Sequence, residues 1–277
     1  MNIKAIWTAG FLVVFLAISS PSAFAHGVTH DRLEAVNHDI SHCPDDPVLY
    51  VKRGRVHADA EHWDEALKDY ETALKIDPDY HETRFWQGDV LIRMGKYQRA
   101  RATLQIYLKH LPESPSGNRA MGQVMLKLAE FTKAADYYDR AIESDANPPP
   151  QLYLERARAL MQARPLPEKR ILAGLAAGLV RHPFNVPIIE QLVNVNVSLE
   201  AYTQAIMAMN SLPAVVQDLP NWIIRRAKIE ALRGQRTDAL RLYTRALERL
   251  EAMPEKRKRL PAFVRARHLA ERGIASL

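Results

Sequence analysis

The stretch that decides the fold is PVLYVKRGRVHADAEHWDEALKDYETALKIDPDY, residues 47–80. The next 34 residues, 81–114, and the 34 after them, 115–148, can be written beneath it column by column. Gly54 then stands above Gly88 and Gly122, and an alanine follows each glycine twelve residues later, at positions 66, 100 and 134. A period kept in several columns indicates repeated structural units that stack on one another.

Each unit is expected to be a helical hairpin. Apolar residues recur at spacings of three and four, which predicts a first helix around residues 48–56 and a second over 63–76 in the first unit. The small residues Gly54 and Ala66 allow two helix backbones to approach closely. Pro78 ends the second helix because it lacks the amide hydrogen that the helix needs. One face of each hairpin can be covered only by a neighbouring hairpin.

These columns resemble the tetratricopeptide repeat family, and the first unit carries the pattern in Tyr50, Gly54, Ala66, Tyr70, Ala73 and Pro78. The second and third units depart from it, with Arg84, Leu104 and Asn118 where aromatic residues are usual. The resemblance implies an all-α fold, a right-handed solenoid of helical hairpins. It also implies a non-catalytic scaffold that binds another protein or peptide in a concave groove.

The repeats decay after the three clear units of residues 47–148 and return near the C-terminus. Residues 149–219 are interpreted as degenerate hairpins, interrupted by Pro165-Leu166-Pro167, and residues 186–218 indicate only a second helix. Residues 220–277 hold one more unit and a basic cap helix. Residues 26–46 form an N-terminal extension with a cap helix over residues 28–42. We therefore predict about six hairpins with flanking caps.

Residues 1–25 have the layout of a secretory signal peptide. Lys4 precedes a mostly apolar run from Ile6 to Ile18, and Ala23-Phe24-Ala25 fits a cleavage site with small residues. The alternative is an uncleaved membrane anchor, but the run is shorter than the roughly 20 residues that span a bilayer. We expect cleavage after Ala25, a periplasmic or secreted bacterial protein, and no transmembrane segment in the mature chain.

Charge is unevenly distributed along a chain whose formal net charge is +6. Residues 221–277 hold 15 Lys and Arg against 6 Asp and Glu, whereas residues 26–150 hold 16 against 21. The basic C-terminal end is either a contact for an acidic partner or a solvated helix face. A nucleic-acid partner is not expected, because aromatic residues are not interleaved with these charges as single-strand binding requires.

No catalytic signature is visible. The sequence has no Gly-rich loop after a strand, no G-x-S-x-G and no H-E-x-x-H, and its acidic residues are scattered over the repeats. The single cysteine, Cys43, excludes an intrachain disulfide and a zinc site built on paired cysteines. We expect neither catalysis nor a catalytic cofactor.

Four histidines near the N-terminus raise a second possible function: His26, His30, His38 and His42. After cleavage, His26 would offer a terminal amine and an imidazole, a combination that can chelate copper. His38 and His42 are spaced i, i+4, on one helix face. The alternative function is therefore copper binding or delivery, and the opposing interpretation is a polar extension with surface histidines.

The family resemblance also implies where a partner would bind. Residues three before, one after and five after the glycine column tend to point into the groove, and these positions hold Arg55, Asp59, Phe85, Asp89, Arg93, Arg119 and Gln123. A guanidinium suits a carboxylate, and Phe85 would supply an apolar anchor. The alternative is that all seven are ordinary solvated residues of a degenerate repeat array.

Overall fold

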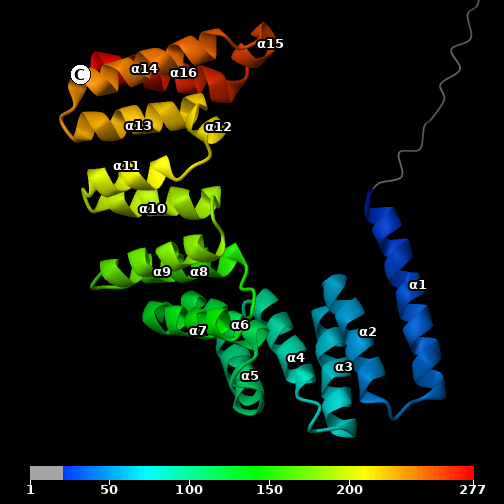
Figure 1. The fold of residues 1–277 in the computed structure, drawn as a ribbon. Helices are drawn as coiled ribbons and strands as arrows, with labels where there is room; N and C mark the ends of the chain where they lie inside the picture. Colours follow the sequence, from blue (N-terminus) through cyan, green and yellow to red (C-terminus); the bar gives the residue numbers. More distant parts are fainter. Residues whose placement is uncertain (1–20) are drawn as a thin grey trace, which may run out of the picture. The chain divides into compact units, whose positions relative to one another are not determined.

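The computed structural model describes the backbone of residues 21–277 and the side chains from residue 29 onward (Figure 1). This described part of the chain contains helices and turns and no strand. In chain order the helices are α1 (Pro21–His42), α2 (Pro47–Asp59), α3 (Trp63–Ile76), α4 (Glu82–Arg93), α5 (Tyr97–His110), α6 (Pro115–Lys127), α7 (Phe131–Glu143), α8 (Pro150–Gln162), α9 (Glu168–Arg181), α10 (Val186–Ser198), α11 (Tyr202–Asn210), α12 (Ala214–Gln217), α13 (Pro220–Leu232), α14 (Arg236–Glu251), α15 (Glu255–Lys258) and α16 (Pro261–Ala275).

The helices follow the order that six hairpins with a cap at each end require, so the predicted all-α class is confirmed. The first helices of the hairpins, α2, α4, α6, α8, α10 and α13, are called A helices below, and their partners B helices. The chain divides into two compact units, the first ending at Met94 and the second covering Gly95–Leu277.

In the first unit, α2 and α3 form a hairpin with α1 on one side and α4 on the other. Asp46 caps α2 by accepting a hydrogen bond from the amide of Val48 at 2.9 Å, and Pro47 starts the helix without an unsatisfied amide. Leu33, Val36 and Ile40 are half-buried among exposed residues of α1. A helix is present where the cap helix was expected, over residues 28–42, and it begins earlier, at Pro21.

In the second unit, α6 packs with α7, α8 with α9, α10 with α11, and α13 with α14. Helix α5 packs on α6, and α16 covers the last hairpin through the fully buried Ala270. The alanine column behaves as expected in both units, because Ala66, Ala100, Ala134 and Ala239 are all fully buried. Residues of this size let helices approach closely.

Helix α10 corrects the expectation that residues 186–218 hold only a second helix. Its sequence is rich in Val, Ile and Asn, which are modest helix formers, so the pattern did not indicate it. Burial of Ile188, Ile189 and Val193 overrides that weak propensity, and Asn185 caps the helix by accepting from the amide of Ile188 at 3.1 Å.

No helix in the described part of the chain is both long enough and apolar enough to cross a membrane. The expected signal peptide falls largely on residues 1–20, which lie outside the described residues. Export therefore stays a prediction.

Candidate functional site

The A helices share one register, which places the predicted groove positions. The small or apolar residue of the glycine column is buried in every A helix, and the column reads Gly54, Gly88, Gly122, Ala157, Val193 and Ala227. The residues three before, two before and one after each column residue define what we call the A-helix face. All seven predicted groove residues are at least partly exposed, as residues that contact a partner must be.

In the first unit, an aromatic pair joins two of the predicted residues. The guanidinium carbon of Arg55 on α2 lies 4.1 Å from the centre of the Trp86 ring on α4, a cation–π contact. Phe85 meets the same indole edge to face, with ring centres 5.0 Å apart. Among the described residues Arg55 has no carboxylate partner. The structure thus combines an aromatic surface with an unneutralised cation.

The other predicted residues of this unit are engaged in ion pairs. Asp89 pairs with Arg93 one turn later on α4, at 2.9 Å. Asp59, at the end of α2, lies 3.4 Å from Arg32 of the cap helix α1. Both pairs are at least partly exposed to solvent, so each contributes about 1 kcal/mol at most. A partner can exchange such contacts at little cost.

A buried hydroxyl lies close to these charges. Tyr70 of α3 is fully buried, and its hydroxyl has no hydrogen-bond partner among the described residues. Burial raises the pKa of Tyr70, the charge of Asp89 raises it further, and the charges of Arg55 and Arg93 oppose the shift. The tyrosine is therefore neutral at all physiological pH values and remains a hydrogen-bond donor.

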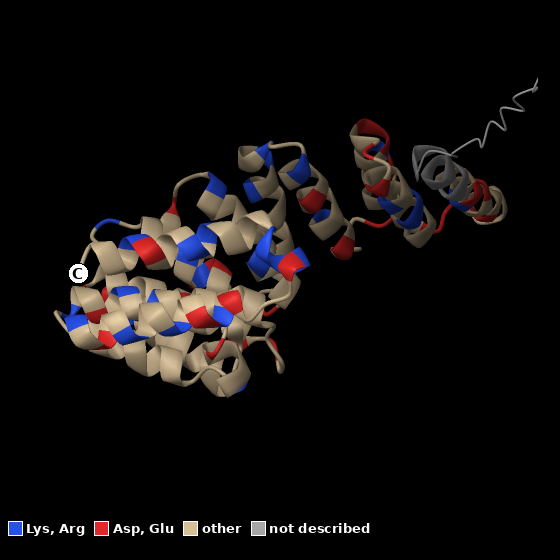
Figure 2. Ribbon diagram, turned by 90° about the horizontal axis from the view of Figure 1, so that it is seen from above, with Lys and Arg blue, Asp and Glu red and all other residues tan. Residues whose placement is uncertain are grey.

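In the second unit, charged pairs link successive A helices. Arg119 on α6 donates two hydrogen bonds to the carboxylate of Glu155 on α8, at 3.0 and 2.7 Å. Arg225 on α13 lies 3.2 Å from a carboxylate oxygen of Glu190 on α10. Arg119 and Glu190 each stand three before their column residue, and Glu155 and Arg225 each stand two before theirs. The two pairs therefore join the same two positions of neighbouring repeats, with the positive and negative charges exchanged. Figure 2 shows basic and acidic positions interspersed over the helices of this unit.

A second contact also recurs between neighbouring repeats. Arg225 donates a short hydrogen bond to Asn194, which stands one after its column residue. Arg55 also stands one after its column residue, and Trp86, like Arg225, stands two before its column residue. The same two positions therefore meet in both units, once as a hydrogen bond and once as a cation–π contact. The contact follows from the repeat register rather than from one particular pair of side chains.

A hollow of about 540 Å³ opens between α8 and α10, and both of its walls are A helices. One wall carries Leu154, Arg158 and Gln162, which stand three before, one after and five after Ala157. These are the groove positions of the first three units, carried into a region where the sequence pattern had decayed. The opposite wall includes Glu190 and Asn194.

The surroundings of Arg119 and Arg225 shift the pKa values of these two arginines in opposite directions. The hydrogen bonds that Arg119 donates to Glu155 raise the pKa of Arg119, whereas burial lowers the pKa of Arg225 against the opposing effect of Glu190. Both guanidinium groups stay charged at neutral pH. Within the second unit, the arrangement offers charged hydrogen bonds and amides spaced along consecutive helices, a set of groups suited to holding an extended chain.

Sequence reasoning missed several members of this face, among them Trp86, Glu155 and Arg225. All three stand two before a column residue, a position that the predicted set did not include. A signal was available, because each is a large aromatic or charged residue at the same offset in its repeat. What the sequence did not show is which residue of the neighbouring repeat each one contacts.

The structure describes the side chains of three of the four N-terminal histidines, His30, His38 and His42. The side chain of His26 lies outside the described residues. His30 lies 3.3 Å from Glu34, and the rings of His38 and His42 are 4.4 Å apart, with Nδ1 of His42 at 2.9 Å from the carbonyl oxygen of His38. Side chains from residue 29 onward include no group of three or more His, Cys, Asp or Glu that could hold a metal ion. Copper binding stays a prediction.

The fold and this register define a protein built of stacked helical hairpins. Residues 51–118 match the family model of the tetratricopeptide repeat. The expected resemblance is confirmed, and residues 51–118 hold tetratricopeptide repeats. Proteins of this kind are generally non-catalytic scaffolds that bind other proteins.

Three solved structures illustrate the likeness. YrrB, described as a TPR protein with an unusual peptide-binding site, is 17% identical, with 76% of this chain and 97% of that one covered and a TM-score of 0.54. The C-terminal part of a TPR repeat-containing protein from Cytophaga hutchinsonii is 14% identical, with 84% and 96% covered and a TM-score of 0.63. PilW, described as a type IV pilus biogenesis factor, is 16% identical, with 76% and 96% covered and a TM-score of 0.51. A comparison with curated proteins gives no match. These likenesses concern the fold alone.

Proposed function

We propose that this chain is an exported, non-catalytic scaffold that binds an extended segment of another protein along its A-helix face. The observation that carries the proposal is the hollow between α8 and α10, because A helices alone form both of its walls. The groove positions of the repeat line it at the same offsets as in the first three units. A surface that repeats in this way offers equivalent places for successive residues of a bound chain.

The chemistry of the hollow favours a polypeptide over a single charged ligand. Its lining combines apolar side chains, such as Leu154 and Pro187, with the amide groups of Gln162 and Asn194. Its volume of about 540 Å³ falls within the usual range of ligand sites. Amides can pair with the backbone of a bound segment while apolar side chains accept its side chains. The peptide-binding site named for YrrB supports the same use of a similar fold.

The first unit would contribute a contact for an acidic group. Arg55 lies over Trp86 with no carboxylate partner among the described residues, and Phe85 extends the aromatic surface. Arginine and aromatic residues carry much of the binding energy in protein interfaces. We therefore expect the partner to place a carboxylate beside an apolar side chain where it meets this unit.

Variants of the A-helix face test the proposal. One variant combines Arg55→Ala with Trp86→Ala in the first unit, and another combines Arg158→Ala with Asn194→Ala in the second. The matched control combines Arg140→Ala with Glu143→Ala, two exposed residues of the B helix α7. Partner capture from an extract of the exporting cell should fall about tenfold or more for each face variant, since interface hot spots contribute about 2 kcal/mol or more. The control should capture at the wild-type level.

The result that would overturn the proposal is capture by both face variants at the wild-type level while circular dichroism shows that they are folded. In that case the basic C-terminal end would become the next surface to test. Loss of capture in the control variant alone would place the binding surface on the B helices.

Export rests on the N-terminal sequence, with the basic, apolar and small-residue segments of residues 1–25 as its support. The mature chain should begin at His26. Intact mass of the protein recovered from a periplasmic fraction measures this directly. A recovered chain that keeps residues 1–25 would refute cleavage.

A further inference from the structure

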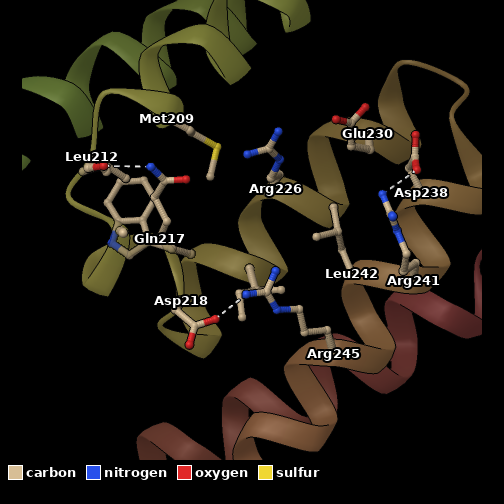
Figure 3. Close-up of a pocket in the computed structure, with 13 residues that line it drawn as sticks. Met209, Leu212, Gln217, Asp218, Arg226, Glu230, Asp238, Arg241, Leu242 and Arg245 are labelled. Carbon is tan, nitrogen blue, oxygen red and sulfur yellow. Dashed lines mark hydrogen bonds and ion pairs between the residues drawn. The ribbon is translucent and has the colours of Figure 1, made fainter.

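A second cavity, distinct from the A-helix face, opens in the second unit between the fifth and sixth hairpins (Figure 3). Its volume is about 540 Å³, and its walls come from the end of α11, from α12, and from α13 and α14. Figure 3 shows three arginines of α13 and α14 at this cavity, together with Met209, Leu212 and Gln217 from the α11–α12 segment. The proposed function makes no use of this site.

The cavity exists because one B helix is short. Helix α11 has 9 residues, whereas the B helices α9 and α14 have 14 and 16. The chain leaves α11 at Asn210 and turns through the short helix α12, instead of continuing along α13. The space beside α13 is thus left open where a full-length B helix would cover it. The short helix gives this repeat a feature that the regular hairpins lack.

One end of the cavity is apolar. Met209, Leu212 and Trp222 belong to the buried cluster between the fifth hairpin and α13, and each is at least 94% buried. Their cavity-facing atoms form a preformed apolar surface that is already shielded by the surrounding core. An apolar ligand group placed there would lose little conformational freedom on the protein side.

The cavity also carries charges, and every carboxylate among its lining residues already has a partner. Asp238 accepts from Arg241 at 3.0 Å, and Glu230 accepts from Arg233 at 2.8 Å. Asp218 is bridged by Arg245 and Arg249, at 2.5 and 2.7 Å. The local acids are therefore fully neutralised, and two of them hold nearby arginines in place.

Arg226 is different. It is half-buried in the cavity wall, and its guanidinium donates one hydrogen bond, of 2.8 Å, to the neutral side-chain oxygen of Asn210 at the end of α11. Among the described residues it has no carboxylate within ion-pair distance. A guanidinium has five N–H donors, so most of those on Arg226 remain available to a ligand. Asn210 holds the group at the cavity.

We infer that this cavity is a binding site for a carboxylate attached to an apolar group. The apolar part would lie against Met209, Leu212 and Trp222, and the carboxylate would pair with Arg226. Two sources supply this chemistry: a small amphiphilic acid, or the C-terminal residue of a polypeptide when that residue is apolar. Both present one anionic group next to an apolar one.

Isothermal titration calorimetry on the purified protein tests the site with four probes. Octanoate and octanol have the same chain with and without the carboxylate. The peptide acetyl-Gly-Ala-Leu-Phe is used with a free C-terminus and with an amidated one. We expect at least one of the two carboxylate probes to bind, and to bind about tenfold or more tightly than its uncharged counterpart, because a hydrogen bond to a charged group contributes about 1.5–3 kcal/mol.

Three variants complete the test. Arg226→Gln should weaken binding of the carboxylate probe about tenfold or more. Lys228→Gln, which removes the same charge from an exposed position on the same helix, should stay within about twofold of wild type. Ala214→Trp, which places a large side chain at the exposed start of α12, should abolish binding by filling the cavity.

The titrations distinguish the two sources of the carboxylate and can refute the inference. Binding of octanoate alone identifies a small acid as the source, and binding of the free-carboxylate peptide alone identifies a protein C-terminus. The inference is overturned if no carboxylate probe binds at millimolar concentration, if the uncharged probes bind equally well, or if Arg226→Gln binds like wild type. These results do not bear on the A-helix face, because neither Arg226 nor Ala214 belongs to it, and Lys228, which does belong to it, serves only as the charge control.

Discussion

Replacing Gly54 with alanine should measure how closely the two helices of the first hairpin approach. An ideal Cβ at Gly54 would lie 2.5 Å from Cε1 of Tyr70, 2.9 Å from Cδ1 and 3.1 Å from Cζ. Carbon atoms attract best at about 3.5–4.0 Å, so the ring would have to move by about 1 Å. Tyr70 is fully buried, and such a shift would displace the core around it.

Two opposing effects set the magnitude. Overpacking a filled core costs about 1–3 kcal/mol. Alanine in a helix interior gains about 1 kcal/mol over glycine from helix propensity. The net change should therefore lie between neutral and about 2 kcal/mol of destabilisation. In a Tyr70→Leu background the ring is absent, so Gly54→Ala should stabilise by up to about 1 kcal/mol. The predicted coupling between the two sites is about 1–3 kcal/mol.

Urea unfolding of the four proteins of this double-mutant cycle measures the coupling. Because the chain has two compact units, the first must be followed separately. In a Trp222→Phe background, the fluorescence of Trp63 and Trp86 reports on that unit. If Gly54→Ala stabilises both backgrounds equally, Tyr70 does not pack against Gly54 and the helix register is wrong.

Three further predictions address other parts of the chain. Gly174→Ala should destabilise the second unit by about 0.5–2 kcal/mol, because an ideal Cβ would lie 1.5 Å from Nη1 of the buried Arg156 and would displace that charged hydrogen-bonding group at a cost of about 1.5–3 kcal/mol, whereas alanine gains about 1 kcal/mol over glycine from helix propensity. Thermal melts measure the net change, and an unchanged melt contradicts it. Burial lowers the pKa of His57 below 6.5, so the stability that this residue contributes is present above about pH 6.5 and is lost as the pH falls below that value. Between pH 7 and pH 5 the free energy of unfolding should therefore fall less for His57→Gln than for wild type, and equal falls would exclude this role. If the histidines bind copper, His26→Ala should weaken the affinity about tenfold or more, and calorimetry that detects no copper uptake by wild type would end that hypothesis.

The hairpin repeat could be predicted because packing imposes it on the sequence. A close helix approach requires a small residue at Gly54 and Ala66, and the same requirement recurs every 34 residues. Helix α10 could not be predicted in this way, since burial of its Val and Ile residues stabilises it against their weak propensity. The division after Met94 was also not visible, because the period continues unbroken through that residue.

The candidate site could be predicted in part, for a similar reason. The repeat register identified exposed positions such as Arg55 and Arg119. It did not show that Glu155 neutralises Arg119 or that Trp86 supports Arg55, because those contacts depend on how successive hairpins are rotated against one another. The cavity at Arg226 depends on the early end of one helix, which a degenerate stretch of sequence does not reveal.

The central claim is that a partner binds on the A-helix face, and site-specific photo-crosslinking tests it most directly. A photoreactive phenylalanine analogue is placed at Arg158 on the A helix α8, or at Arg140 on the B helix α7, both exposed positions of the second unit. After irradiation in the exporting cell, the account predicts a partner adduct from position 158 and none from position 140. Adducts from position 140 alone would contradict it.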